Sequence, residues 1–149
     1  MRDGGTGEMT VQTASRIPRL RPYQWEAGRA VMSSVLHNRG QTITIEMARQ
    51  GGKNELSAQI ELLLMGFRIE TGGDIIKCAP TLRPQLLLSA RRLWLRITQA
   101  SMTQMAKHAE NSIAVGEARV LFLSAAPGAS VVGHTASLLL EVDEAQDVD

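Results

Sequence analysis

Two glycines and a lysine, Gly51, Gly52 and Lys53, have the types and the spacing of a phosphate site. They follow a β-branched run, residues 42–48, and they precede a helical pattern of apolar residues. Backbone N–H groups of a glycine turn and of a helix N-terminus can bind an anion together, and a lysine adds a point charge. We therefore expect the N–H groups of residues 50–54 to bind phosphate oxygens.

The order strand, loop, helix matches part of the phosphate-binding pattern G-x-x-x-x-G-K-[ST]. Gly52 and Lys53 fit this pattern, but Met47 stands at its first glycine position and Asn54 stands at its Ser/Thr position. The carboxamide oxygen of Asn54 is still a hard ligand that Mg²⁺ accepts, with a longer reach than a hydroxyl. Taken alone, the pattern is more typical of a glycine turn ahead of a core helix with a solvated lysine.

Two adjacent carboxylates, Asp143 and Glu144, end an apolar run near the end of the sequence. Hydrolysis of a nucleoside triphosphate needs phosphate binding, Mg²⁺ and a group that orients the attacking water. Asp143 would hold Mg²⁺ directly or through water, and Glu144 would polarise the water. A solvated acidic strand end is the alternative interpretation. The order of the two motifs along the chain favours a single site formed with Lys53.

The elements that must position these residues alternate between helices and strands. We expect strands at residues 42–48, 75–79, 112–115, 120–124 and 137–142, and helices that begin after Pro22 and Lys53 and extend over 82–107, the last one capped by Thr81. This alternation predicts an α/β fold with a mainly parallel sheet flanked by helices. Functional loops then lie at the carboxyl ends of the strands, where both motifs fall.

Length and composition predict one globular domain. The chain has 149 residues, 44% of them hydrophobic, and its net charge is +1, which provides no overall basic field for nucleic-acid binding. Residues 1–19, rich in Gly, Thr and Ser, predict a flexible arm ahead of a domain over 20–149. Four arginines of the helix over 82–107 could line a nucleic-acid path, but a solvated face is the favoured interpretation: Arg83, Arg91, Arg92 and Arg96.

The single cysteine, Cys78, cannot form an internal disulfide, and no Cys/His cluster has zinc-ligand spacing. No apolar run is long enough for a membrane span, and the N-terminus has no apolar signal core. We therefore expect a soluble cytoplasmic protein without a membrane partner.

Four stretches together resemble the N-terminal part of the ATPase domain of a tailed-phage terminase large subunit, the motor that packages viral DNA. Residues 20–24 (LRPYQ) resemble its adenine-contacting segment, and residues 48–54 (ARQGGKN) resemble its deviant Walker A loop, which often lacks the first glycine. Residues 79–81 (APT) with Gln85 resemble the motif after the second strand. Residues 138–146 (LLLEVDEAQ) resemble Walker B with its catalytic glutamate.

The resemblance implies a P-loop NTPase of the additional-strand, RecA/helicase-like type that uses ATP and Mg²⁺. It implies that Gln24 contacts adenine and that Arg49 reaches the triphosphate. The remaining implied roles are phosphate binding by Gln50, Gly51, Gly52, Lys53 and Asn54, catalysis by Lys53 and Glu144, and Mg²⁺ binding by Asp143 and Asn54.

The same resemblance implies partners and a longer chain. Double-stranded DNA, a portal protein and a small terminase subunit are the expected partners, with a homo-oligomeric ring in the host cytoplasm rather than in the virion. The family continues with a coupling strand between the Walker A and Walker B strands and then with a nuclease domain. We therefore expect a fragment whose sheet has a gap at the place of the coupling strand. Such a fragment should bind nucleotide better than it hydrolyses it.

Two alternatives remain open from the sequence. One is a helicase-like DNA translocase, because residues 143–146 (DEAQ) and the segment around Gln24 also resemble helicases. The pair Arg49 and Gln50, and the lack of Ser or Thr after Lys53, disfavour this alternative. The other is a non-catalytic nucleotide-binding remnant, which Asn54 and the early stop favour.

Overall fold

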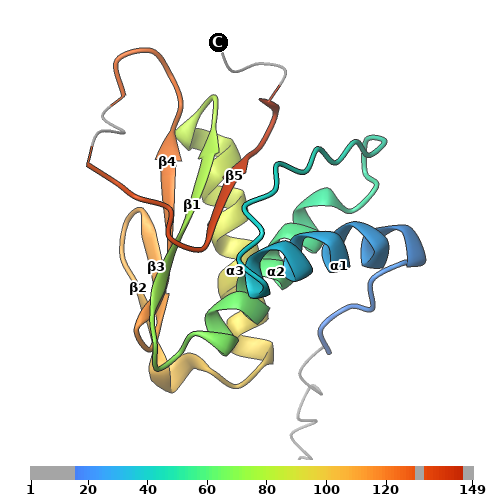
Figure 1. The fold of residues 1–149 in the computed structure, drawn as a ribbon. Coiled ribbons are helices and arrows are strands. Elements are labelled where there is room, and N and C mark those ends of the chain that lie inside the picture. Colours follow the sequence, from blue (N-terminus) through green and yellow to red (C-terminus); the bar gives the residue numbers. More distant parts are fainter. Residues whose placement is uncertain (1–15, 130–132, 146–149) are drawn as a thin grey trace, which may run out of the picture.

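The computed structural model describes residues 16–129 and 133–145 (Figure 1). Most of the expected flexible arm, and Gln146 of the expected Walker B stretch, lie outside the described residues. The last residues of the arm that are described contact the domain. Ile17 packs against the core, and the Gln59 side chain donates a hydrogen bond of 2.8 Å to the Pro18 carbonyl.

Five strands form one mixed sheet in the order β2-β3-β4-β1-β5. Their bounds are Gly73–Ala79 for β1, Ala106–His108 for β2, Ser112–Val115 for β3, Ala118–Ser124 for β4 and Leu139–Val142 for β5. Strand β1 pairs in parallel with both β4 and β5, whereas β2, β3 and β4 pair antiparallel. The expected mainly parallel sheet is therefore mixed, because a short turn between β3 and β4 can only connect antiparallel neighbours.

Three α-helices cover one face of this sheet, as Figure 1 shows: α1 (Pro22–Leu36), α2 (Lys53–Phe67) and α3 (Leu87–Gln99). The apolar stripe expected on α2 supplies core residues such as Leu56, Ile60 and Leu64, which pack with Leu93 of α3 and Val120 of β4. The fold is α/β, with a five-stranded mixed sheet flanked by helices.

The expected helix over 82–107 is wrong in its extent. A short π-helical turn, Leu82–Leu86, precedes α3, and Ser101 then has a left-handed φ of 58° that ends the right-handed helix. A 3₁₀ turn, Thr103–Met105, and strand β2 follow. Met102, which directly precedes the 3₁₀ turn, packs against the core. Its apolar side chain therefore reflects burial in a turn and not a continuation of the helix. Thr81 does precede the helical turn, but its hydroxyl bonds to the Gln85 side chain instead of capping the backbone.

The expected strand over 42–48 is also wrong, because this segment pairs with no other strand. Its side chains nevertheless alternate as in a strand: Ile43, Ile45 and Met47 turn inward against the core, and the residues between them are exposed. A strand requires a neighbouring backbone, and here the nearest sheet edge, β5, lies across an open groove. Figure 1 shows the segment running on the outer side of β5.

This edge groove has a volume of about 930 Å³ and separates residues 40–46 from residues 136–145. Its walls combine apolar side chains with a polar end formed by Lys53, Ser57 and Asp143. A gap at this place is what the resemblance implies for a sheet without the coupling strand. Strand β5 is consequently an edge of the sheet as described, with Leu140 58% exposed and Val142 45% exposed.

Candidate functional site

The glycine loop, residues 48–54, has a backbone conformation that requires glycine. Its turn is closed by a hydrogen bond of 2.8 Å from the Gly51 amide to the Ala48 carbonyl. Gln50 and Gly52 both have left-handed φ values, 60° and 86°. A Cβ atom at position 52 would collide with the side-chain amide nitrogen of Gln24. Glycine at 52 therefore avoids the strain of a left-handed φ and leaves room for the Gln24 side-chain amide, which would otherwise have to shift.

Two side chains of the first turn of α1 hold this loop in place by hydrogen bonds. The Tyr23 hydroxyl donates a hydrogen bond of 2.7 Å to the Gly51 carbonyl, and the Gln24 amide donates one of 2.9 Å to the Gly52 carbonyl. The Gln24 carbonyl oxygen in turn accepts a hydrogen bond from the Arg21 backbone amide. Gln24 is only 4% exposed, so in this arrangement it supports the loop, and its contact with adenine stays a prediction.

Lys53 and the two carboxylates, which are far apart in sequence, meet in space. The Lys53 ammonium lies 2.7 Å from Asp143 Oδ1 and 3.2 Å from Glu144 Oε1. Partial burial by itself would lower the pKa of Lys53, but Asp143 and then Glu144 raise it overall by hydrogen bonding and by their charge. The two motifs thus form one charged site at the carboxyl end of β5, as the sequence predicts.

The backbone turns sharply at the carboxylates. Glu144 has a left-handed φ of 52°, and its amide donates a hydrogen bond of 3.0 Å to Asp143 Oδ1. The Asp143 amide in turn donates to the Cys78 carbonyl at 2.8 Å and continues the pairing of β5 with β1. Left-handed backbone at a residue other than glycine is costly and tends to occur at functional sites.

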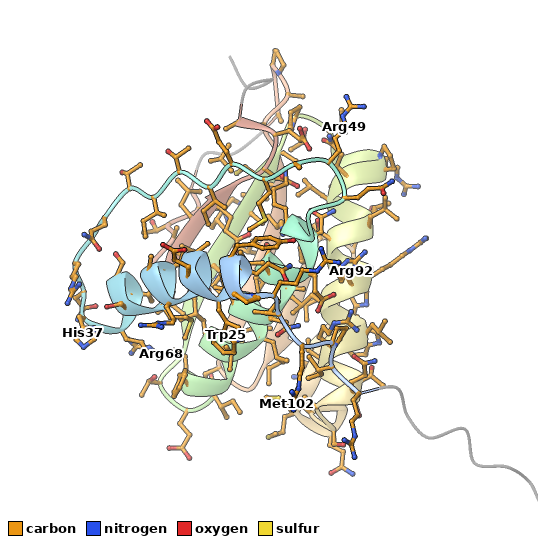
Figure 2. The ribbon with its side chains drawn as sticks, turned by 90° about the vertical axis from the view of Figure 1, so that its right-hand side faces the viewer. Trp25, His37, Arg49, Arg68, Arg92 and Met102 are labelled. Atoms are coloured by element: carbon orange, nitrogen blue, oxygen red, sulfur yellow. The ribbon has the colours of Figure 1, made fainter. Side chains whose placement is uncertain are left out.

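A second cavity, the loop cavity, lies between the glycine loop and the side of the molecule formed by Gln85 and Arg92. It has a volume of about 1020 Å³ and is lined by residues 45–55 together with Gln85, Arg92 and Glu144. Figure 2 shows Arg49 at the rim of the loop, and this side chain is exposed. Charges of both signs line the loop cavity, because Glu46, Glu55 and Glu144 border it beside Arg49, Lys53 and Arg92. Arg92 pairs with Glu55, and Lys53 pairs with Asp143 and Glu144.

The site has oxygen donors for a divalent cation but not a complete protein cage. Asn54, which is exposed, borders both cavities close to Asp143 and Glu144. Within residues 16–129 and 133–145, no three His, Cys, Asp or Glu side chains converge on a point. This donor set suits Mg²⁺, which usually takes one or two carboxylates together with substrate phosphates and water.

Helix α3 is attached to the start of α2 by an arginine. The Arg96 guanidinium bonds to both carboxylate oxygens of Glu55, at 2.7 Å and 2.5 Å. Arg96 is 5% exposed, so the expected solvated position is wrong for this residue, whereas Arg83, Arg91 and Arg92 are exposed as expected. Burial by itself would raise the pKa of Glu55, but the bonds to Arg96, Gln59 and Arg92 lower it.

A buried charged cluster beneath the site escaped the sequence reasoning. Lys77 of β1 contacts Glu61 of α2 and Glu141 of β5, and Ser57 bridges the two carboxylates. The sequence signals were present, since Lys77 interrupts the apolar strand β1 and Glu61 lies within the apolar stripe of α2. Charged residues in such surroundings are almost never fully buried unless they are paired. The Tyr23 contact with the loop left no comparable signal.

Comparisons of this chain with known protein families, with curated proteins and with solved structures each found no match. No helix in the described part of the chain is long and apolar enough to cross a membrane.

Proposed function

We propose that this chain is a P-loop NTPase module that binds Mg-ATP at the glycine loop. One observation carries this proposal: Lys53 of the loop lies 2.7 Å from Asp143, at the end of a separate strand. Opposite charges can also pair at a surface without a function. Here, however, the lysine belongs to the glycine loop and its partners end a strand, 90 or more residues later in the sequence. Their contact favours a single functional site over the two alternatives from the sequence, a solvated lysine and a solvated acidic strand end.

Each residue of the site has a role in the proposed activity. The loop amides and Lys53 bind the triphosphate from the loop cavity, and Arg49 approaches it from the rim. Asp143 and Asn54 supply oxygen ligands for Mg²⁺, which when bound offsets charge on the phosphates. Glu144 accepts a hydrogen bond from the attacking water and orients it. In the structure Lys53 pairs with the carboxylates of Asp143 and Glu144. Ligand binding therefore requires the Lys53 side chain to move toward the phosphates.

We further propose that the module belongs to a DNA-packaging motor of the terminase type, on the strength of the resemblance given above. In this proposal double-stranded DNA, a portal protein and a small subunit are the partners, and the active form is a ring of several copies. The edge groove supports the proposal, because it separates residues 40–46 from β5, the segments that resemble the Walker A and Walker B strands between which the family has a further strand. We propose that an extended segment pairs with β5 in this groove.

The direct test measures thermal unfolding with and without Mg-ATP. A ligand at about 100 times its Kd stabilises a protein by about 2.7 kcal/mol. For a domain of this size that corresponds to a shift in Tm of roughly 5–10 °C. We expect this shift in the wild type and its loss in Lys53→Ala. Lys107→Ala, which removes an exposed lysine from β2, is the matched control and should keep the shift.

Equal unfolding temperatures with and without nucleotide in the wild type would reject the site. Protection that survives in Lys53→Ala would place the nucleotide elsewhere on the chain. Protection by Mg-ATP without measurable turnover would favour the non-catalytic alternative. The feature of the sequence that favours this alternative is Asn54, which stands at the Ser/Thr position of the phosphate-binding pattern. ATP hydrolysis stimulated by single-stranded rather than double-stranded DNA would favour the helicase-like alternative.

A further inference from the structure

Lys77 is the centre of a buried charged cluster that joins three elements. Its ammonium lies 3.0 Å from Glu61 Oε1 of α2 and 3.4 Å from Glu141 Oε2 of β5, and it donates to the Ser57 hydroxyl. Ser57 in turn donates to Glu141 at 2.5 Å. Lys77 and Glu141 are also direct neighbours in the parallel pairing of β1 with β5. Helix α2 and strand β5 are thus bridged through Lys77 and Ser57.

Strand β5 has few other attachments, although it carries the carboxylate pair. It has four residues, pairs only with β1 among the described strands, and exposes Leu140 and Val142. Glu141 lies two residues before Asp143 on this strand. Apart from the contacts of Lys53 with Asp143 and Glu144, the bridge from Glu141 to α2 is the side-chain contact that holds the end of β5 beside the glycine loop.

The two lysines of this region differ in their freedom to move. The Lys53 side chain is 40% exposed, whereas that of Lys77 is 2% exposed. Under the proposed function Lys53 moves from Asp143 and Glu144 to the ligand phosphates. Lys77 cannot follow because it is enclosed. It keeps its charge, since Glu61 and Glu141 raise its pKa more than burial lowers it.

We propose that Lys77 is a positioning residue, which through Glu141 holds Asp143 and Glu144 in place when Lys53 turns to the ligand. This inference rests on the proposed function, because only nucleotide binding would draw Lys53 away from the carboxylates. The bridge between Glu141 and α2 can nevertheless be tested without a nucleotide. The decisive variant is Glu141→Gln, which removes the charge of the bridge while keeping its shape. Glu61→Gln is the matched control, because it replaces the other carboxyl group that contacts Lys77 by an amide without touching β5.

Hydrogen exchange at the Asp143 amide reports on the attachment of β5. In Glu141→Gln we expect exchange at this amide to rise about ten-fold or more, the size expected from losing a hydrogen bond to a charged group. The Phe122 amide, which bonds to the Asn111 carbonyl across the sheet, is the internal reference and should change little. Glu61→Gln should leave the Asp143 amide close to wild type.

With nucleotide present, the Mg²⁺ concentration that gives half of the thermal protection by ATP should rise about ten-fold in Glu141→Gln and not in Glu61→Gln. Equal increases in exchange at Asp143 and Phe122 would mean a general loss of stability and would overturn the positioning role. Unchanged exchange at Asp143 would overturn it as well. A wild type that shows no nucleotide protection refutes the proposed function alone, since the exchange measurement still decides whether the bridge holds β5.

Discussion

Glu144 combines an unfavourable backbone conformation with contacts on both of its sides. Its φ is 52°, its amide bonds to Asp143, and its carboxylate lies 3.2 Å from the Lys53 ammonium. The side chain is 33% exposed, so water can reach it. A left-handed backbone also occurs at Asn38 and Ser101, so the accessible carboxylate beside Lys53, rather than the φ alone, makes Glu144 the candidate for the proposed role.

We expect Glu144→Gln to bind Mg-ATP as well as the wild type does but to lose whatever hydrolysis the wild type has. The glutamine keeps the shape of the side chain and cannot accept a proton, a role that typically contributes a factor of about 10²–10⁴ in rate. Steady-state phosphate release measures turnover, and thermal protection measures binding. Glu110→Gln, at an exposed position, is the control. Unchanged turnover in Glu144→Gln would reject Glu144 as the catalytic residue.

At the scale of elements, helix α2 has one glycine just before its start and another near its end. The backbone and the space around the first disfavour any side chain, whereas the second could be replaced by alanine without a clash. Gly52 has φ of 86° and no room for a Cβ atom, whereas a Cβ at Gly66 would meet nothing within 4 Å. Gly66 is the second-last residue of α2 and is exposed, and glycine in a helix costs up to roughly 1 kcal/mol relative to alanine.

Substitution of each glycine by alanine should therefore change stability in opposite directions. Gly66→Ala should raise the free energy of unfolding by up to about 1 kcal/mol. Gly52→Ala should lower it by more than about 1 kcal/mol, because the left-handed backbone and the contact with Gln24 are both disturbed. Urea denaturation of the two variants beside the wild type measures both effects. A stabilised Gly52→Ala would show that the loop does not need the described conformation.

At the scale of the whole molecule, the buried cluster links stability to pH. Burial raises the pKa of Glu61 to about 8 from an ordinary value of 4.5, and the nearby Lys77 only partly opposes this rise. The folded state therefore holds a proton that the unfolded state releases. The stabilisation is fully present below about pH 4.5 and is lost as the pH rises toward about 8.

We expect the free energy of unfolding to fall between these limits with a slope of up to about 1.4 kcal/mol per pH unit. Glu61→Gln cannot titrate, so its stability should depend less on pH over the same range. Thermal unfolding from pH 5 to pH 9 measures both proteins, with Glu110→Gln as the exposed control. Identical pH profiles for wild type and Glu61→Gln would contradict a raised pKa at Glu61.

Local patterns were sufficient where neighbouring residues carry the information. The apolar stripe of α2 and the apolar runs of β1, β3 and β4 are short-range features, and the structure has each of these elements. Lys53 meets Asp143 as the order of the two motifs predicts. The expected reason, two parallel strands that end at one edge, does not hold, because residues 42–48 ahead of the loop pair with no strand.

Other features depended on the partners that packing supplies. Residues 42–48 have strand-like alternation but pair with no strand, since pairing needs a second backbone that the edge groove does not hold. Arg96 and Lys77 have the composition of surface residues, yet both are buried because carboxylates from other elements face them. A buried charge needs a counter-charge. The apolar surroundings of Lys77 in the sequence indicated its burial, but only the tertiary structure shows that Glu61 and Glu141 are its partners.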